Sequence, residues 1–135
     1  MIGAPGLPER GPAQRETSVL RLTSATDFER VRRDGRSHAH PLVVLLARRR
    51  PAPEPAQLAA GSRFGFVAGK AVGTAVARNR AKRLLREAAR ASAPEIEPGW
   101  DLVFISRRPL AAARLAEAIQ AVRGLLRRSR ALREG

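Results

Sequence analysis

Residues 63–90 read RFGFVAGKAVGTAVARNRAKRLLREAAR, and this stretch contains the two patterns that decide the fold. Residues 63–68 are mostly apolar and aromatic, which predicts a buried strand. Over residues 72–92, alanines and leucines recur at spacings of three and four, which predicts an amphipathic helix. A strand followed closely by such a helix indicates a domain in which helices pack on a sheet.

Four further segments extend this pattern in both directions. Residues 23–35 contain hydroxyl and acidic side chains, then apolar positions and a closing glycine, which predicts a short capped helix. Residues 42–47 and 100–105 are apolar runs that predict two more strands, and residues 115–130 have the apolar spacing of a last helix. The order of elements predicts an α/β fold (an α+β sandwich), with a small mixed sheet of three to four strands packed with three helices.

The composition divides the chain into one domain and two tails. Residues 1–18 combine three prolines and three glycines with few large apolar groups, which predicts a disordered N-terminal tail. Residues 19–131 are expected to form a single domain, since 135 residues leave little room for a second core. Within it, the proline-containing residues 50–62 predict a flexible loop, and residues 132–135 a C-terminal tail.

The charge balance points to a polyanionic partner. The chain has 26 lysines and arginines against 12 acids, a formal charge of +14 and a pI near 11.9. It has no cysteine, which excludes disulfides, thiol chemistry and cysteine-ligated zinc. We find no signal-peptide core and no apolar run of the roughly eighteen residues that span a bilayer, so we expect a soluble, cytoplasmic protein.

The predicted helix over residues 72–92 is strongly basic on one side. At about 100° per residue, its alanines and leucines form one apolar stripe, and most of its cations gather away from it. Cations three and four residues apart repel one another, so an external anion explains the row better than a solvated face does. The candidate phosphate-binding residues are Lys70, Arg78, Asn79, Arg80, Lys82, Arg83, Arg86 and Arg90. Arg78 and Arg80 lie off the stripe, so alanine there should cost anion affinity with little loss of stability.

Residues 70–87, KAVGTAVARNRAKRLLRE, resemble the signature segment of the bacterial ribonuclease P protein component, K-x-V-G-N-A-V-x-R-N-R-x-K-R-x-L-R-E. Matches outside the segment support the resemblance, which covers about residues 20–130: Asp27-Phe28, Phe64-Gly65-Phe66-Val67 and Asp101-Leu102-Val103. The resemblance implies a left-handed crossover between parallel strands through the basic helix, which departs from the usual right-handed rule. It also implies that this helix lies against the catalytic RNA of ribonuclease P.

The resemblance implies a second surface that holds the single-stranded 5′ leader of precursor tRNA, in a cleft between the first helix and the sheet. The candidate cleft residues are Phe28, Arg32, Val43 and Leu46. Phe28 matches a family aromatic, whereas the family often has further aromatics where this chain has the other three residues. Base stacking contributes on the order of 1–3 kcal/mol per base, so this cleft should depend more on charge and apolar contact.

The sequence shows no catalytic grouping of its own, and we predict no catalytic residue and no metal ligand in the protein. His38 and His40 could face one side of an extended segment, but no third ligand accompanies them, so we expect them to have no binding role; of the two functional interpretations, contact with nucleic acid is favoured over a metal. The resemblance implies that the protein alone binds no cofactor and that the RNA subunit mainly holds the magnesium. The implied partners are the catalytic RNA and precursor tRNA, and we expect no membrane association and no requirement for a protein partner.

Two other classes share parts of this description. A structural ribosomal or general RNA-binding protein has the same size and charge but no reason to combine the K-x-V-G turn with the R-N-R helix. A helix-turn-helix DNA-binding protein would need a short helix directly before the basic one, where residues 62–69 predict a strand. We therefore expect an accessory subunit of a ribonucleoprotein endonuclease.

Overall fold

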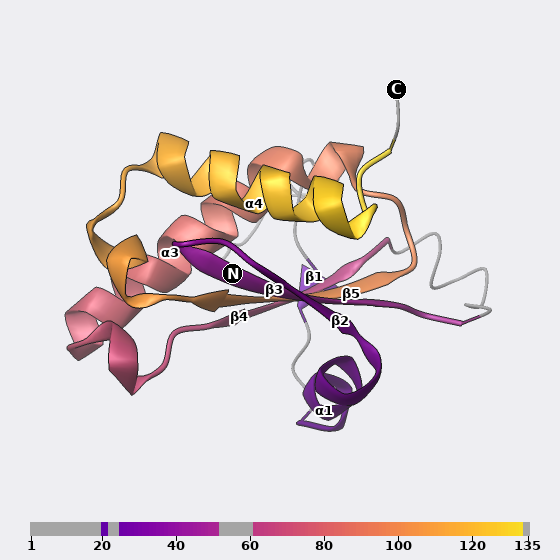
Figure 1. The fold of residues 1–135 in the computed structure, drawn as a ribbon, viewed down its shortest axis with the longest axis horizontal. Helices are drawn as coiled ribbons and strands as arrows, with labels where there is room; N and C mark the ends of the chain where they lie inside the picture. The colour runs from indigo at the N-terminus through magenta and orange to yellow at the C-terminus, as the bar shows by residue number, and fades with distance from the viewer. Residues whose placement is uncertain (1–19, 22–24, 52–60, 134–135) are drawn as a thin grey trace.

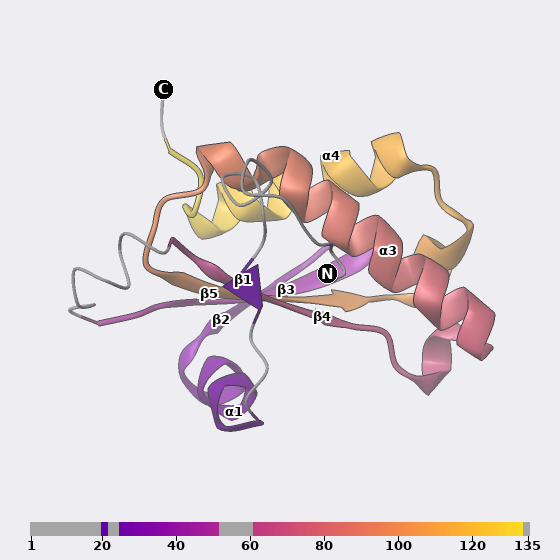
Figure 2. The ribbon, with the colours of Figure 1, turned by 180° about the vertical axis from the view of Figure 1, so that it is seen from behind.

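The computed structural model describes residues 20–21, 25–51 and 61–133, and Figure 1 shows that they form three layers. Helices α3 (Ala75–Ser92) and α4 (Leu115–Ser129) cover one face of the sheet, and α1 (Ala25–Asp34) lies under the other. Figure 2 shows the same layers from behind, with α3 in front of α4. None of the described helices is long and apolar enough to cross a bilayer.

The sheet has five strands in the order β1-β4-β5-β3-β2. Strands β1, β4 and β5 run parallel, whereas β3 is antiparallel to both β5 and β2. Their bounds are β1 (Leu20–Arg21), β2 (Arg36–Ala39), β3 (Val43–Arg49), β4 (Arg63–Val67) and β5 (Trp100–Ser106). The predicted fold, a small mixed sheet packed with three helices, is confirmed.

The strand β2 and the two-residue β1 add to the three strands that the sequence predicts. Strands β4 and β5 are parallel neighbours joined through α3, so the predicted crossover unit is present. Its left hand stays a prediction.

The main core lies between the sheet and the helices α3 and α4. Residues of β3, β4 and β5 that point this way include Leu45, Phe64 and Phe104, and the helices contribute Leu85 and Leu125. The rings of Phe64, Phe66 and Phe104 stack with centroids 6.0–6.4 Å apart. Trp100 is only 8% exposed, so it anchors the end of this core.

The opposite face of the sheet carries a smaller apolar cluster under α1. Its buried members are Val31 and Val103, and the partly buried side chains packed against them are Phe28, Leu46, Val67 and Ile105. Helix α1 ends where Gly35 donates its backbone N–H to the Val31 carbonyl at 2.9 Å. A Cβ on Gly35 would lie 2.5 Å from that oxygen, so the close approach requires glycine.

Several predicted features fall on residues that lie outside the described ones. These are the tail at residues 1–18, most of the loop at residues 50–62, the end of the C-terminal tail, and the cap expected at residues 23–24.

Candidate nucleic-acid interface

A 3₁₀ turn, η2 (Lys70–Val72), and a capped start position the basic helix α3. Gly73 has φ 132°, a conformation that favours glycine, and its N–H donates to the Lys70 carbonyl at 3.1 Å. Thr74 is the N-cap residue, and its side-chain oxygen accepts a hydrogen bond from the Ala77 N–H at 3.1 Å. The turn explains why the helix begins at Ala75 rather than at residue 72.

Helix α3 buries its apolar stripe and presents its cations. Five of the predicted residues, Lys70, Asn79, Arg80, Arg83 and Arg90, are exposed, and Arg78, Lys82 and Arg86 are half-buried. Within the described chain, no carboxylate forms an ion pair with the six cations Lys70, Arg78, Arg80, Lys82, Arg83 and Arg90. The structure therefore brings the predicted residues together on one basic surface, hereafter the α3 surface. Their binding to RNA stays a prediction.

Arg78 and Arg80 differ in what they contact. Arg78 donates to the Gly73 carbonyl at the start of its own helix, at 3.1 Å. Arg80 reaches across to η4 (Arg108–Ala112) and its end, donating to the carbonyls of Ala111 at 2.6 Å and Ala113 at 3.4 Å. Arg80 is thus structural as well as cationic, so the expectation that its loss leaves stability unchanged needs correcting.

Three of the four predicted cleft residues share the α1 side of the sheet. Phe28 is half-buried over Gly65, and Leu46 belongs to the same small cluster. Arg32 is exposed on α1, with Glu29 4.0 Å away. Val43 does not join them, because it is fully buried in the main core on the opposite face.

Strand alternation explains the correction at Val43. Val43, Leu45 and Ala47 point to α3 and α4, so Val44 and Leu46 point to α1. Residues 42–47 are all apolar, so the sequence alone could not reveal which alternate residues face α1 and which face α3 and α4.

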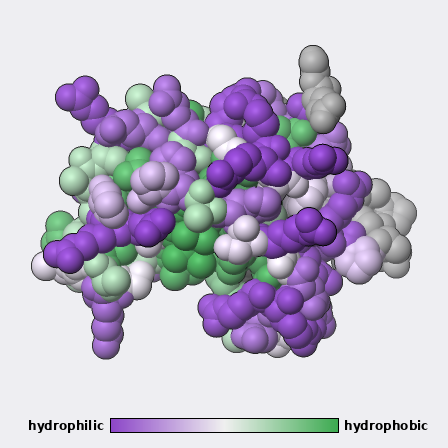
Figure 3. All heavy atoms as spheres, in the orientation of Figure 1, coloured by the Kyte–Doolittle hydropathy of each residue, from purple (hydrophilic) through white to green (hydrophobic). Residues whose placement is uncertain are grey.

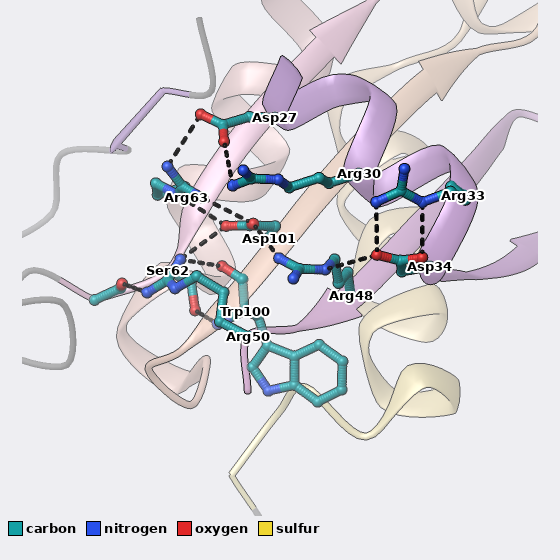
Figure 4. A network of polar contacts seen from close by, with 11 residues as sticks. Asp27, Arg30, Arg33, Asp34, Arg48, Arg50, Ser62, Arg63, Trp100 and Asp101 are labelled. Atoms are coloured by element: carbon teal, nitrogen blue, oxygen red, sulfur yellow. Dashed lines mark hydrogen bonds and ion pairs between the residues drawn. The ribbon is translucent and has the colours of Figure 1, made fainter. Parts of the chain in front are cut away.

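A buried carboxylate at one end of this face ties α1 to three strands (Figure 4). Asp101 is 1% exposed, and Arg63 donates to its two oxygens from Nε and Nη2, both at 2.9 Å. Arg50 and Arg48 approach the same carboxylate at 2.8 and 3.4 Å. Arg63 also pairs with Asp27 of α1 at 3.2 Å. The hydrogen bond to Asp101 raises the pKa of Arg63, so the Arg63 guanidinium keeps its charge beside this carboxylate.

Sequence reasoning missed this network, since it assigned no partner to Asp101 and no role to Arg48 or Arg50. The one signal available was an acid, Asp101, placed inside an apolar strand. A buried carboxylate needs cationic partners.

The two histidines have different surroundings and no metal site forms among the described residues. His40 accepts the Leu42 N–H at Nδ1 at 3.0 Å, which occupies one of its nitrogens. Burial, then the charges of Arg128 and Arg36, lower the pKa of His38.

Comparisons with known proteins find relatives in sequence and in fold. The family model for Ribonuclease P matches residues 17–130. The Ribonuclease P protein component of Herpetosiphon aurantiacus is 45% identical over 109 residues, covering 81% of this chain and 83% of that protein. That of Ruegeria pomeroyi is 52% identical over 91 residues, covering 67% of each. The RNase P protein of Thermotoga maritima, solved with 1-(4-fluorophenyl)-2-thiourea, has a TM-score of 0.67 at 28% identity, covering 80% of this chain and 98% of that one. The Staphylococcus aureus RNase P protein shares the fold, with a TM-score of 0.71 at 23% identity over 85% of this chain and 99% of that one.

Proposed function

The chain belongs to the ribonuclease P protein family, and from this membership we propose that it is the protein subunit of a ribonucleoprotein that removes the 5′ leader from precursor tRNA. In this proposal the α3 surface binds the catalytic RNA, and the cleft beside α1 binds the leader. The α3 surface carries the proposal, because its cations are exposed on a helix whose start is fixed by Gly73 and Thr74.

The charge and rigidity of the α3 surface support contact with an RNA backbone. Arginine presents a planar fork of donors that matches phosphate oxygens, and the surface carries four exposed or half-buried arginines beyond Arg80. Buried alanines and leucines hold the helix against the core, so little ordering is needed before RNA binds.

The cleft combines one aromatic ring with aliphatic surface. Phe28, Leu46, Val67 and Ile105 are only partly buried on this face, so their remaining surface is available to bases of the leader. Arg32 lies on the exposed side of α1, where it can stack on a base or pair with a phosphate. The cleft therefore suits single-stranded RNA with little preference for base identity.

The protein contributes binding rather than chemistry in this proposal. Hydrolysis is assigned to the catalytic RNA and to magnesium held mainly by that RNA, with no cofactor on the protein alone and no other protein required. Phosphates neutralised by the α3 surface would lower the magnesium needed to fold the complex. The proposed place of action is the cytoplasm.

The test is cleavage of precursor tRNA by bacterial ribonuclease P RNA at low magnesium, with and without the chain. We expect strong stimulation at the mature 5′ end. The variant R83Q/R90Q should lose much of it, because two exposed cations leave the α3 surface. R127Q/R133Q, which removes the same charge from exposed positions elsewhere, should stimulate like the wild type.

A wild-type chain that binds RNA tightly without stimulating cleavage would contradict the proposal and favour a structural ribosomal or general RNA-binding protein. Equal behaviour of the two double variants would contradict the role of the α3 surface.

A further inference from the structure

A second basic region lies at the other edge of the sheet, away from the α3 surface. Helix α3 packs over β4 and β5, whereas α4 packs over β3 and the edge strand β2. Where α4 ends beside β2, the surface encloses a pocket of about 890 Å³. Figure 3 shows hydrophilic residues gathered on this side of the molecule. The volume of the pocket is within the roughly 300–1,000 Å³ typical of ligand sites.

The pocket, hereafter the α4–β2 pocket, is lined by five arginines and one carboxylate. Arg36 lies on β2, Arg48 and Arg49 lie on β3, and Arg128 lies on α4. Arg130 directly follows α4. Asp34 supplies the only acid of the lining, and it lies between Arg33 and Arg48 (Figure 4). The pocket therefore has a large excess of positive charge.

Most of this charge has no counter-ion among the residues that the structure describes. Arg48 pairs with Asp101 and Asp34, but in the part of the chain that the structure describes no ion pair involves the other four arginines. Arg128 donates to the Ala39 carbonyl, and the Arg49 guanidinium lies 5.9 Å from the centroid of the Trp100 ring. These contacts hold Arg128 and Arg49 in place without neutralising them, which leaves a concave positive site that attracts anions.

The backbone at Arg130 supports a binding role. Arg130 caps the end of α4 with φ 68°, and it is the one described non-glycine residue with a positive φ. Glycine or asparagine usually occupies such a position. The chain instead places an arginine in a conformation that L residues rarely adopt, and its side chain lines the pocket.

We propose that the α4–β2 pocket binds the phosphodiester backbone of RNA, as a contact separate from both the α3 surface and the cleft beside α1. The proposal rests on the proposed function, since it presumes an RNA partner. Trp100 is buried beneath Arg49, so the pocket offers guanidinium groups rather than an open aromatic face. It should therefore recognise phosphate without regard to base identity.

The phosphates could come from either of two molecules, the catalytic RNA or precursor tRNA, and both are tested. The variant R36Q/R49Q removes two exposed cations that have no ion pair within the described chain, and R127Q/R133Q is its matched control. The dissociation constant of the full chain is measured for each RNA, and for the precursor bound to the reconstituted holoenzyme, over a series of salt concentrations.

We expect R36Q/R49Q to weaken binding of one of the two RNAs about tenfold at moderate salt. The salt slope for that RNA should fall by about one per arginine removed. The RNA that loses affinity is the one that contacts the pocket. In the wild-type chain, the same RNA should raise the pKa of His38, which also lines the pocket, in an NMR titration.

Wild-type affinity and slope for R36Q/R49Q with both RNAs would overturn the proposal, as would an unchanged His38 titration in the bound state. If the wild-type chain bound neither RNA, the proposed function itself would fail. If it bound RNA and stimulated cleavage while R36Q/R49Q behaved like the control, only the pocket proposal would fail.

Discussion

Gly65 shows how the absence of one side chain lets α1 pack closely on the sheet. A Cβ at this position would lie 2.8 Å from two carbons of the Phe28 ring. The Phe28 ring rests directly on the backbone of β4, and this contact sets the distance between α1 and the sheet. We predict that Gly65→Ala lowers the free energy of unfolding by about 1–3 kcal/mol through overpacking.

Urea unfolding measures this prediction, with Phe28→Leu as the second arm. Combining Gly65→Ala with Phe28→Leu should cost less than the sum of the single changes, because the smaller side chain relieves the clash. Gly124→Ala is the control, since a Cβ there meets no atom within 4 Å and alanine should stabilise α4 by about 0.8 kcal/mol. Strict additivity of the Gly65 and Phe28 changes would show that the two residues do not press on one another.

At Arg130 the backbone conformation lowers the stability of the fold, whereas the side chain supplies a cation to the α4–β2 pocket. Glycine in this left-handed conformation avoids a backbone strain of about 1–2 kcal/mol. It also loses about 0.5–1 kcal/mol more conformational entropy on folding, which offsets part of that gain. We therefore predict that Arg130→Gly raises the free energy of unfolding by roughly 0.5–1 kcal/mol while weakening RNA binding. Thermal unfolding and RNA titration of the same sample measure both effects. A less stable variant would mean that the guanidinium stabilises the fold more than the backbone strains it.

At the scale of elements, Asp101 joins β3, β4 and β5 to α1. Replacing it with asparagine removes the negative charge from the centre of three guanidinium groups. We predict that Asp101→Asn lowers the free energy of unfolding by about 3 kcal/mol, because buried cations lose their counter-charge. Urea unfolding checks this, with Asp34→Asn as an exposed control that also contacts Arg48. Equal small losses for the two variants would show that water screens the Asp101 cluster.

Helices α1, α3 and α4 and strands β3, β4 and β5 could be predicted from sequence, because each has a periodicity or an apolar run that local residues define. Strand β2 could not, since Arg36–Ala39 is polar and mostly exposed at a sheet edge. The two-residue β1 is too short to carry a pattern.

The candidate site could also be predicted only in part from the sequence. The α3 surface follows from spacing along one helix. The Asp101 network and the α4–β2 pocket could not be predicted, because they depend on residues that are distant in sequence.

At the scale of the whole molecule, the two basic surfaces lie over different parts of one sheet, with the α3 surface over β4 and β5 and the α4–β2 pocket beside β2. Neighbouring strands are about 4.8 Å apart, so the three steps from β4 to β2 span about 14 Å, more than a Debye length of about 8–10 Å. We predict that R36Q/R49Q and R83Q/R90Q have additive effects on the free energy of RNA binding to within about 0.5 kcal/mol. Binding of the wild type, each pair and the fourfold variant to one holoenzyme preparation measures this. Strong coupling between the pairs would mean that RNA engages the two surfaces as one rigid unit.

The strand order also determines when the protein can fold during its synthesis. Strand β5 lies at the centre of the sheet, and it begins only at Trp100, after the other four strands have been made. Until β5 has been made, the β1–β4 pair and the β2–β3 hairpin have no strand to join them. The N-terminal three quarters of the chain must therefore wait, unfolded and highly basic, for the last quarter, and a chain cut short before Trp100 should be degraded rather than retained as a smaller domain.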